Sequence, residues 1–408
     1  RAAVERFVQE LEPLVGEVLE ADMQSERILI APPEVVTVPA TTVEGWVDFL
    51  RAYKPPWPAK HTKFAFVVIP DKVRRRDQYY YQLKDLLSFQ QSTGLISQML
   101  LSSTLQRTSQ RQQIWKNVIQ QMLVKRGAWL WVISPLPYRG RSVMVVGMDA
   151  CRQSKESPSI QTLCASTNPY FTTYHTTWRS QDPVRANAEP NPPIGDLIKE
   201  ALVRFFQANG RLPDTLVIFR AGVSESQETS LLESEVYRPE GGLLQTLAEV
   251  SAELPLGEEA ARQWRERFEL AYILVRRGTN ARFRTEHNDN MPSGTYIDDG
   301  VVVSREGQGQ AEQSNIFDFY MISQTYVIGT AKPTLYSVLY NTLRLSRYEI
   351  MQLTYRLCAV YMTFSGMVSM PAPLKYAAKL LSMLSKCEST PAEPTDVSSK
   401  WKPFLFFV

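Results

Sequence analysis

The 408-residue sequence has little of what several protein classes require. It holds four cysteines and no CxxC pair, so neither a disulfide framework nor a zinc site is expected, and the thiols are predicted to be buried and reduced. Its three histidines are not spaced as metal ligands usually are, which argues against histidine-centred metal or triad chemistry. It contains no run of 18 or more apolar residues, so no membrane span is expected.

The N-terminal end is amphipathic and acidic, unlike a signal peptide, and it carries no initiator Met. We therefore expect a piece of a longer protein, located inside the cell in the cytoplasm or nucleus. Its length predicts two or three domains, because single cores rarely grow past about 250–300 residues.

Positive charge is concentrated in one part of the chain. Residues 51–150 hold 16 Lys and Arg against 4 Asp, whereas the rest of the chain holds 29 basic and 38 acidic residues. A basic region joined to an acidic one favours a localised anionic partner, with nucleic acid the first candidate. A solvated basic face is the alternative that charge alone leaves open.

The hydrophobic pattern predicts two α/β domains after an N-terminal helix and linker at residues 1–60. In the first domain, 61–135, buried-strand patterns at 63–70 and 95–101 alternate with helical patterns at 74–91 and 109–126, which predicts a parallel sheet. The second domain, 136–408, has strand patterns at 142–150, 162–167, 215–222, 270–278 and 324–329, and helical patterns at 195–209, 347–361 and 374–387. Residues 388–400 are polar, and the apolar residues after them are expected to be buried.

Three acidic residues could carry chemistry, although each has an ordinary structural explanation. Asp149 ends an apolar strand, where a lone carboxylate is costly unless it is paired, bound to metal or exposed at an edge. Glu189 lies in a Pro-rich loop, and Glu225 follows another strand.

The segment FRAGVSESQ, residues 219–227, resembles the YRDGVSEGQ signature of the Argonaute/Piwi family. Further segments resemble the family in order: VMVVGMDA, ASTNPYFTTYHTTW, LPDTLVIFR, NARFR, PSGTYIDDGVV, FDFYMISQ, GTAKPTLYSVLY, LTYRLC, SMPAPLKYAAKL and the terminal FLFFV. The resemblance covers about residues 63–408, is closest to the Piwi clade, and leaves the family's N-terminal and PAZ domains without a counterpart. It implies a MID–PIWI lobe of α/β class, with a Rossmann-like MID domain followed by an RNase H-like PIWI domain.

In this family the PIWI domain cleaves a target strand paired to a guide, through two Mg²⁺ ions held by Asp, Glu, Asp and a fourth residue, usually His or Asp. By resemblance, the first Asp is Asp149, and an ungapped count makes Glu189 the Glu. The third and fourth positions fall on Ala221 and Ala378, which cannot bind a cation. Glu225 is too far along the chain to replace the third ligand. We therefore expect a pseudo-endonuclease, and the sequence does not distinguish natural from engineered loss.

The family's MID domain holds the 5′ phosphate of the guide. By resemblance, the residues of this pocket are Tyr80, Lys84, Gln98, Gln121 and Lys125. Lysines can bind phosphate as point charges and a Tyr ring can stack on a base, although each residue alone would pass for an ordinary helix surface. Gln121 matches the Piwi clade, in which a Mg²⁺ ion helps to neutralise the phosphate; by resemblance, Gln121 and the C-terminal carboxylate, here that of Val408, would help to hold this ion.

The expected function is therefore a slicer-inactive protein of RNA silencing that binds a small guide RNA and a complementary target RNA. Protein partners are expected, and one could be a chain that supplies the N-terminal and PAZ domains; no organic cofactor is implied. Two alternatives stay open. One is a residual Mg²⁺-dependent, guide-directed endonuclease that uses Asp149 and Glu189, and the other is a protein-interaction scaffold without RNA binding.

Overall fold

The computed structural model describes residues 2–19, 35–38, 42–52, 64–71, 76–88, 96–133, 140–152, 157–181, 194–302, 316–326, 328–387 and 404–408. Its chain forms two compact units, Arg1–Trp131 with Ser382–Val408, and Val132–Leu381. The last residues join the first unit, where Lys386 donates to the Tyr81 hydroxyl at 3.1 Å and the Arg126 guanidinium lies over the Phe404 ring. The boundaries of the two units therefore differ from those of the predicted domains, 61–135 and 136–408, because the C-terminal residues belong to the first unit.

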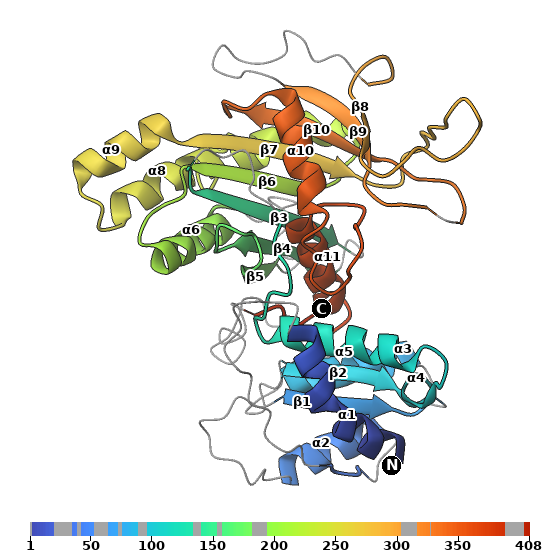
Figure 1. The fold of residues 1–408 in the computed structure, drawn as a ribbon. Coiled ribbons are helices and arrows are strands. Elements are labelled where there is room, and N and C mark those ends of the chain that lie inside the picture. Colours follow the sequence, from blue (N-terminus) through green and yellow to red (C-terminus); the bar gives the residue numbers. More distant parts are fainter. Residues whose placement is uncertain are drawn as a thin grey trace. The chain divides into compact units, whose positions relative to one another are not determined.

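The first unit contains a two-stranded parallel sheet of β1 (Phe64–Ile69) and β2 (Ile96–Leu101). Its helices are α1 (Ala2–Leu19), α2 (Val43–Ala52), α3 (Arg76–Ser88), α4 (Ser102–Gln106) and α5 (Arg111–Lys125). Figure 1 shows these elements at the blue end of the colour scale. The predicted order of strand, helix, strand and helix is confirmed, as is the parallel pairing.

Apolar side chains from helix and strand form the core of this unit. Leu83 and Leu87 of α3 are buried against Val67 and Ile69 of β1. Helix α1 packs along α5, where the Phe7 ring makes an edge contact with Trp115 at 5.1 Å between centroids. The N-terminal helix is therefore an integral part of the first unit.

The second unit is built on an eight-stranded sheet in the order β5-β4-β3-β6-β7-β10-β9-β8. Strands β3, β6 and β7 are parallel, and the remaining pairings are antiparallel. The bounds are β3 (Val143–Arg152), β4 (Ser159–Ser166), β5 (Tyr174–Gln181), β6 (Thr215–Ala221), β7 (Glu269–Arg276), β8 (Thr295–Ile297), β9 (Phe317–Ile322) and β10 (Thr334–Asn341).

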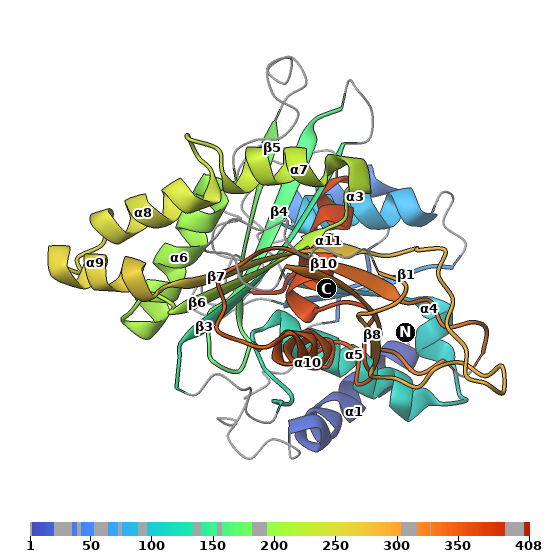
Figure 2. The ribbon, with the colours of Figure 1, turned by 90° about the horizontal axis from the view of Figure 1, so that it is seen from above.

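The helices of this unit are α6 (Gly195–Asn209), α7 (Glu228–Leu231), α8 (Leu243–Glu253), α9 (Glu258–Arg267), α10 (Arg347–Leu357) and α11 (Ala372–Leu384). A 3-10 turn (Glu225–Gln227) precedes α7, and a π-helical turn (Leu232–Val236) follows it. In Figure 2, α6 and α8 lie on one side of the strands and α10 on the other. No described helix is long and apolar enough to cross a membrane.

Alternation along β3 places its residues on two faces of the sheet. Met144, Val146 and Met148 pack in the core shared with α6, so Gly147 and Asp149 face the other way. A Cβ on Gly147 would lie 2.1 Å from the backbone of Pro373, which explains why glycine is needed where the start of α11 meets the sheet. Asp149 therefore projects on the face covered by α11.

Some sequence predictions need correction. Asp149 does not end its strand, because β3 continues through pairing with β4 to Arg152. The candidate strand at 324–329 is wrong: the described residues there form no strand, and the nearby strand is β9. All four cysteines are free, and Cys151 is half-buried rather than buried. The segment 388–400 lies outside the described residues, and the predicted burial of the C-terminal apolar residues is confirmed for Leu405, Phe406 and Phe407.

Candidate functional sites

Two buried lysines meet in the first unit. Lys84 is on α3 and Lys125 ends α5, and their side chains are 1% and 2% exposed. Both ammonium groups donate to the carbonyl oxygen of Ser97 on β2, at 2.9 Å from Lys84 and 2.8 Å from Lys125. Lys84 also donates to the Ser97 hydroxyl at 3.0 Å. Two positive charges thus converge on one neutral acceptor in the interior.

Two glutamines extend this cluster. The Lys125 ammonium donates to Gln98 Oε1 at 2.7 Å, and Gln98 Nε2 donates to Gln121 Oε1 at 3.0 Å. Gln98 follows Ser97 on β2, and Gln121 lies one turn before Lys125 on α5, so strand and helix together fix the chain of contacts. Four of the residues matched to the phosphate pocket are therefore brought together, and we call Lys84, Gln98, Gln121 and Lys125 the lysine–glutamine cluster.

The other two matched residues lie in the same unit. Tyr80 precedes Lys84 by one turn of α3, is half-buried against the core, and packs edge-on against Tyr81. Burial raises the pKa of Tyr80 to about 12, with Tyr81 and Cys387 adding to the effect, so its ring is a neutral phenol at physiological pH. Val408 is partly exposed, and among the described residues no hydrogen bond links it to the lysine–glutamine cluster.

The electrostatics of the cluster favour an anion. Burial lowers the pKa of Lys84 to about 8, because the charged ammonium has lost most of its water. A bound anion would restore favourable interactions for both lysines at once. Phosphate fits this chemistry, since ammonium groups bind it as point charges and amide side chains can orient its oxygens.

A cavity of about 480 Å³ lies in the second unit. Its lining comes from the ends of β3, β6 and β7 and from α11: Asp149, Ala221, Gly222, Val223, Val275, Arg276, Arg277, Gly278, Thr279, Met370, Leu374 and Ala378. Three of the four residues matched to the catalytic tetrad, Asp149, Ala221 and Ala378, therefore share one cavity. The fourth, Glu189, lies outside the described residues.

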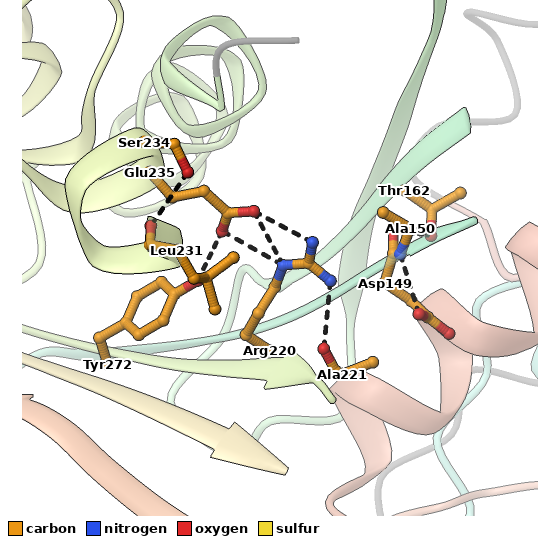
Figure 3. Close-up of polar contacts among 9 residues, drawn as sticks. All are labelled: Asp149, Ala150, Thr162, Arg220, Ala221, Leu231, Ser234, Glu235 and Tyr272. Atoms are coloured by element: carbon orange, nitrogen blue, oxygen red, sulfur yellow. Dashed lines mark hydrogen bonds and ion pairs between the residues drawn. The ribbon is translucent and has the colours of Figure 1, made fainter. Parts of the chain in front are cut away.

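The sheet brings Asp149 and Ala221 together. Met148 pairs with Arg220 in the parallel register of β3 and β6, so the next residues of the two strands lie at the same level. The Thr162 hydroxyl on β4 donates to the carbonyl of Ala377 at 3.0 Å and fixes α11 beside them. Figure 3 shows Asp149, which lies within β3, beside Ala221, the last residue of the adjacent strand β6.

Asp149 is a largely buried carboxylate. It accepts a hydrogen bond from its neighbour's backbone N–H, Ala150, at 2.8 Å. Burial raises the pKa of Asp149, and the positive charges of Arg220 and Arg277 oppose that rise. Arg220 is itself engaged by Glu235, at 3.0 Å from Nη2 to Oε1, and Tyr272 donates to the same carboxylate (Figure 3).

These residues do not fit a pair of divalent cations. Asp149 is the sole carboxylate among the described residues that line the cavity, and the matched third and fourth ligands are methyl groups. Throughout the described part of the chain, no three His, Cys, Asp or Glu side chains gather as a metal site requires. Hard cations need several converging oxygen ligands, which the described lining residues do not supply.

Sequence reasoning missed two contributors. Ser97 anchors both lysines through its backbone carbonyl, which carries no side-chain signature, although its position directly before Gln98 could have suggested it. Arg277 lines the cavity just beyond β7, where the paired arginines in VRRG pass for an ordinary solvated strand end.

A family model described as the Piwi domain matches residues 64–387. The chain is 28% identical to Piwi-like protein Ago3 of Bombyx mori over 79% of this chain and 31% of that protein. It is 28% identical to Piwi-like protein 3 of Homo sapiens over 86% of this chain and 37% of that protein. The chain thus spans about a third of the length of these curated relatives.

Solved structures have a similar fold. The crystal structure of Drosophila Piwi matches with a TM-score of 0.72 at 24% identity, over 99% of this chain and 49% of that one. The C-terminal lobe of a budding yeast Argonaute matches with a TM-score of 0.67 at 18% identity, over 90% of this chain and 72% of that one. Kluyveromyces polysporus Argonaute with a guide RNA matches with a TM-score of 0.69 at 17% identity, over 100% and 46%. The predicted mixed α/β fold is therefore confirmed as that of an Argonaute C-terminal lobe.

Proposed function

This chain belongs to the Piwi family, and from that premise we propose that it binds the 5′-phosphorylated end of a small guide RNA. It presents the guide to a complementary target RNA in RNA silencing and does not cut that target. In this proposal the first unit is a Rossmann-like MID domain and the second an RNase H-like PIWI domain. Partner proteins then act on the captured target, and a chain with N-terminal and PAZ domains is one such partner.

The observation that carries the proposal is the convergence of Lys84 and Lys125 on Ser97. Burying one ammonium group costs free energy, and burying two beside the same carbonyl oxygen adds their mutual repulsion. An RNA 5′ phosphate offsets that cost because its charge pairs with both lysines. One of the structural neighbours was solved with a guide RNA, which supports the same class of ligand.

The remaining pocket residues have defined tasks. Gln98, held by Lys125 and Gln121, orients its amide toward the phosphate oxygens, while the neutral ring of Tyr80 offers a face for the first base. Gln121 and the Val408 carboxylate supply the hard oxygen donors that Mg²⁺ prefers. When bound there, Mg²⁺ would neutralise charge on the phosphate.

The proposal that the target stays uncut rests on the cavity of the second unit. Ala221 and Ala378 stand where the family pattern has metal ligands, and Asp149 alone cannot hold two cations. A residual nuclease remains the alternative outcome, and it would be recognised by Mg²⁺- or Mn²⁺-dependent product that Asp149→Ala abolishes.

The test is the affinity of labelled guide RNA with a 5′ phosphate or a 5′ hydroxyl, measured across a salt series with Mg²⁺ present. Lys84→Met should abolish the phosphate preference. Lys116→Met is the matched control, because it removes the same charge from α5 at a residue outside the cluster. Equal binding of the two RNA ends by the wild-type protein would overturn the proposal and favour the protein-interaction scaffold.

A further inference from the structure

Residues that follow α11 in the chain hold the ring of Tyr81. The Lys386 ammonium donates a hydrogen bond to the Tyr81 hydroxyl at 3.1 Å, and its nitrogen lies 4.6 Å from the centroid of the ring. The Cys387 thiol donates to the backbone carbonyl oxygen of Tyr81 at 3.7 Å. A cation beside an aromatic ring adds a favourable electrostatic interaction. Tyr81 is therefore held through both its side chain and its backbone.

The backbone of this segment is itself fixed. The N–H groups of Lys386 and Cys387 both donate to the carbonyl oxygen of Met383, at 3.1 Å each, and form a turn directly after α11. Cys387 is buried, whereas Lys386 is exposed. A cation at the C-terminal end of a helix is stabilised by the helix dipole. The ammonium group that contacts Tyr81 thus starts from a fixed point in the first unit.

Tyr81 in turn restricts the ring of Tyr80. Successive residues on a helix normally point in different directions, yet the centroids of these two rings are 5.0 Å apart and their planes are nearly perpendicular, at 88°. Such an edge contact is favourable between aromatic rings. Tyr80 also packs against the core cluster that contains Leu83. Contacts with Tyr81 and with the core together limit the rotation of the Tyr80 ring.

We propose that Tyr81 and Lys386 are positioning residues, which hold the Tyr80 ring in the plane on which the first base of the guide stacks. Stacking needs parallel planes, and a ring that is already held in one orientation loses less freedom when the base binds. Lys386 acts through Tyr81, and Tyr81 acts through Tyr80, without contact to the RNA. The inference rests on the proposed function, because the guide base is the ligand of Tyr80 there.

Two affinity ratios separate this effect from binding of the phosphate. The phosphate preference is the affinity for a 5′-phosphorylated guide relative to a 5′-hydroxyl guide, and it depends on the lysine–glutamine cluster. The base contribution is the affinity for a 5′-phosphorylated guide relative to the same guide with an abasic first position. Positioning residues of Tyr80 should change the base contribution, whereas general damage to the first unit would lower both ratios.

The experiment measures both ratios for the full chain by fluorescence anisotropy. The base contribution of the wild type should be roughly tenfold, and Lys386→Met or Tyr81→Ala should lower it to about threefold, because the ring is no longer held in one orientation. Lys386→Arg keeps a cation at the ring and should recover most of the loss. Lys116→Met on α5 and Tyr170→Ala, at an exposed tyrosine of the second unit, are the matched controls.

A second background shows whether Lys386 acts through Tyr80. In Tyr80→Ala the base contribution should already be small, and adding Lys386→Met should lower it no further. A further loss there, or a fall in the phosphate preference of Lys386→Met, would place Lys386 on the guide itself and overturn the inference.

The two proposals fail in different ways. A wild-type protein without phosphate preference would overturn the proposed guide pocket. A wild-type protein that has the preference but shows no base contribution, or one whose base contribution is unchanged by Lys386→Met and Tyr81→Ala, would overturn this inference alone.

Discussion

The two units hold polar sites that differ in the residue types at their matched positions and in their charge. In the first unit, two fully buried lysines and two glutamines form one connected cluster, and every matched side chain of that cluster is polar. In the second, the matched positions share a cavity, but two of them are alanines and the surrounding charge is positive. The comparison teaches that the two sites differ both in the burial of their charged side chains and in the residue types at the matched positions.

The two sites also differ in how far their charged side chains are buried. Lys84 and Lys125 are desolvated, so their retention is costly unless a ligand compensates for it. Arg277 is exposed and costs little. We therefore expect the first site to respond more strongly to pH than the second.

The largest expected effect comes from restoring the lost ligands. Ala221→Asp with Ala378→Asp adds two carboxylates to the cavity that holds Asp149, so Mn²⁺ should raise the melting temperature of the double variant and leave that of the wild type unchanged. Guide-directed cleavage should then appear in the variant alone. Ala221→Asn with Ala378→Asn is the neutral control, and cleavage by the wild-type protein would contradict the proposed difference between the sites.

Removing charge from the first site should have the next largest effect. Lys84→Met or Lys125→Met leaves one ammonium to pair with the phosphate, so affinity for 5′-phosphorylated guide should fall roughly a hundredfold. Affinity for the 5′-hydroxyl guide should change far less. Titration of both RNAs checks this, and an equal loss for the two ends would indicate general damage rather than a phosphate pocket.

The pH dependence should sharpen the comparison further. The pKa of Lys84 is lowered to about 8, and phosphate favours its protonated form, so binding should be flat below pH 8. Above pH 8 the lysine must take up a proton to bind, and affinity should fall by up to about tenfold per pH unit. Binding curves between pH 6.5 and 9.5 test this, with Lys84→Met predicted to remove the pH dependence and Lys116→Met to keep it.

The smallest effect is on stability without RNA. Because the folded pKa of Lys84 lies below the unfolded value, the unfolded state binds more protons between about pH 8 and 10.4, and stability should rise across that window. Below pH 8 the full cost of the buried charge is present, so Lys84→Met should stabilise the ligand-free protein by about 1–2 kcal/mol. Thermal unfolding at pH 7 and pH 10 checks this; a variant less stable than the wild type at pH 7 would contradict it.

The sequence predicted the bounds of a helix correctly where an amphipathic run ends at a glycine. Helix α6 has the bounds expected from the sequence, because its amphipathic run ends at Gly210 in the left-handed region. Strands β5, β8, β9 and β10 were missed, since their mixed polar and aromatic residues give no continuous apolar run. Asp149 was wrongly placed at a strand end, because pairing with β4 extends the strand beyond its apolar part.

The sequence identified a larger share of the residues in the first site than in the second. Helical spacing and the family resemblance identified Lys84, Gln121 and Lys125, and the resemblance alone identified Gln98. The structure joins Gln98 to Gln121 and Lys125 by hydrogen bonds and links Lys84 to Lys125 through the Ser97 carbonyl. The role of Ser97 depends on a backbone carbonyl, so its residue type could not reveal it. Arg277 and Ala378 line one cavity although they lie about a hundred residues apart in the sequence, and only the fold brings them together.

One measurement tests the central contrast most directly. A 5′-phosphorylated guide RNA is loaded onto the protein, an end-labelled complementary target is added with Mg²⁺, and both retention and length of the target are followed in parallel with a 5′-hydroxyl guide. We predict that the target is retained at full length and that retention depends on the 5′ phosphate. A shortened target, or equal retention with either guide, would contradict the account.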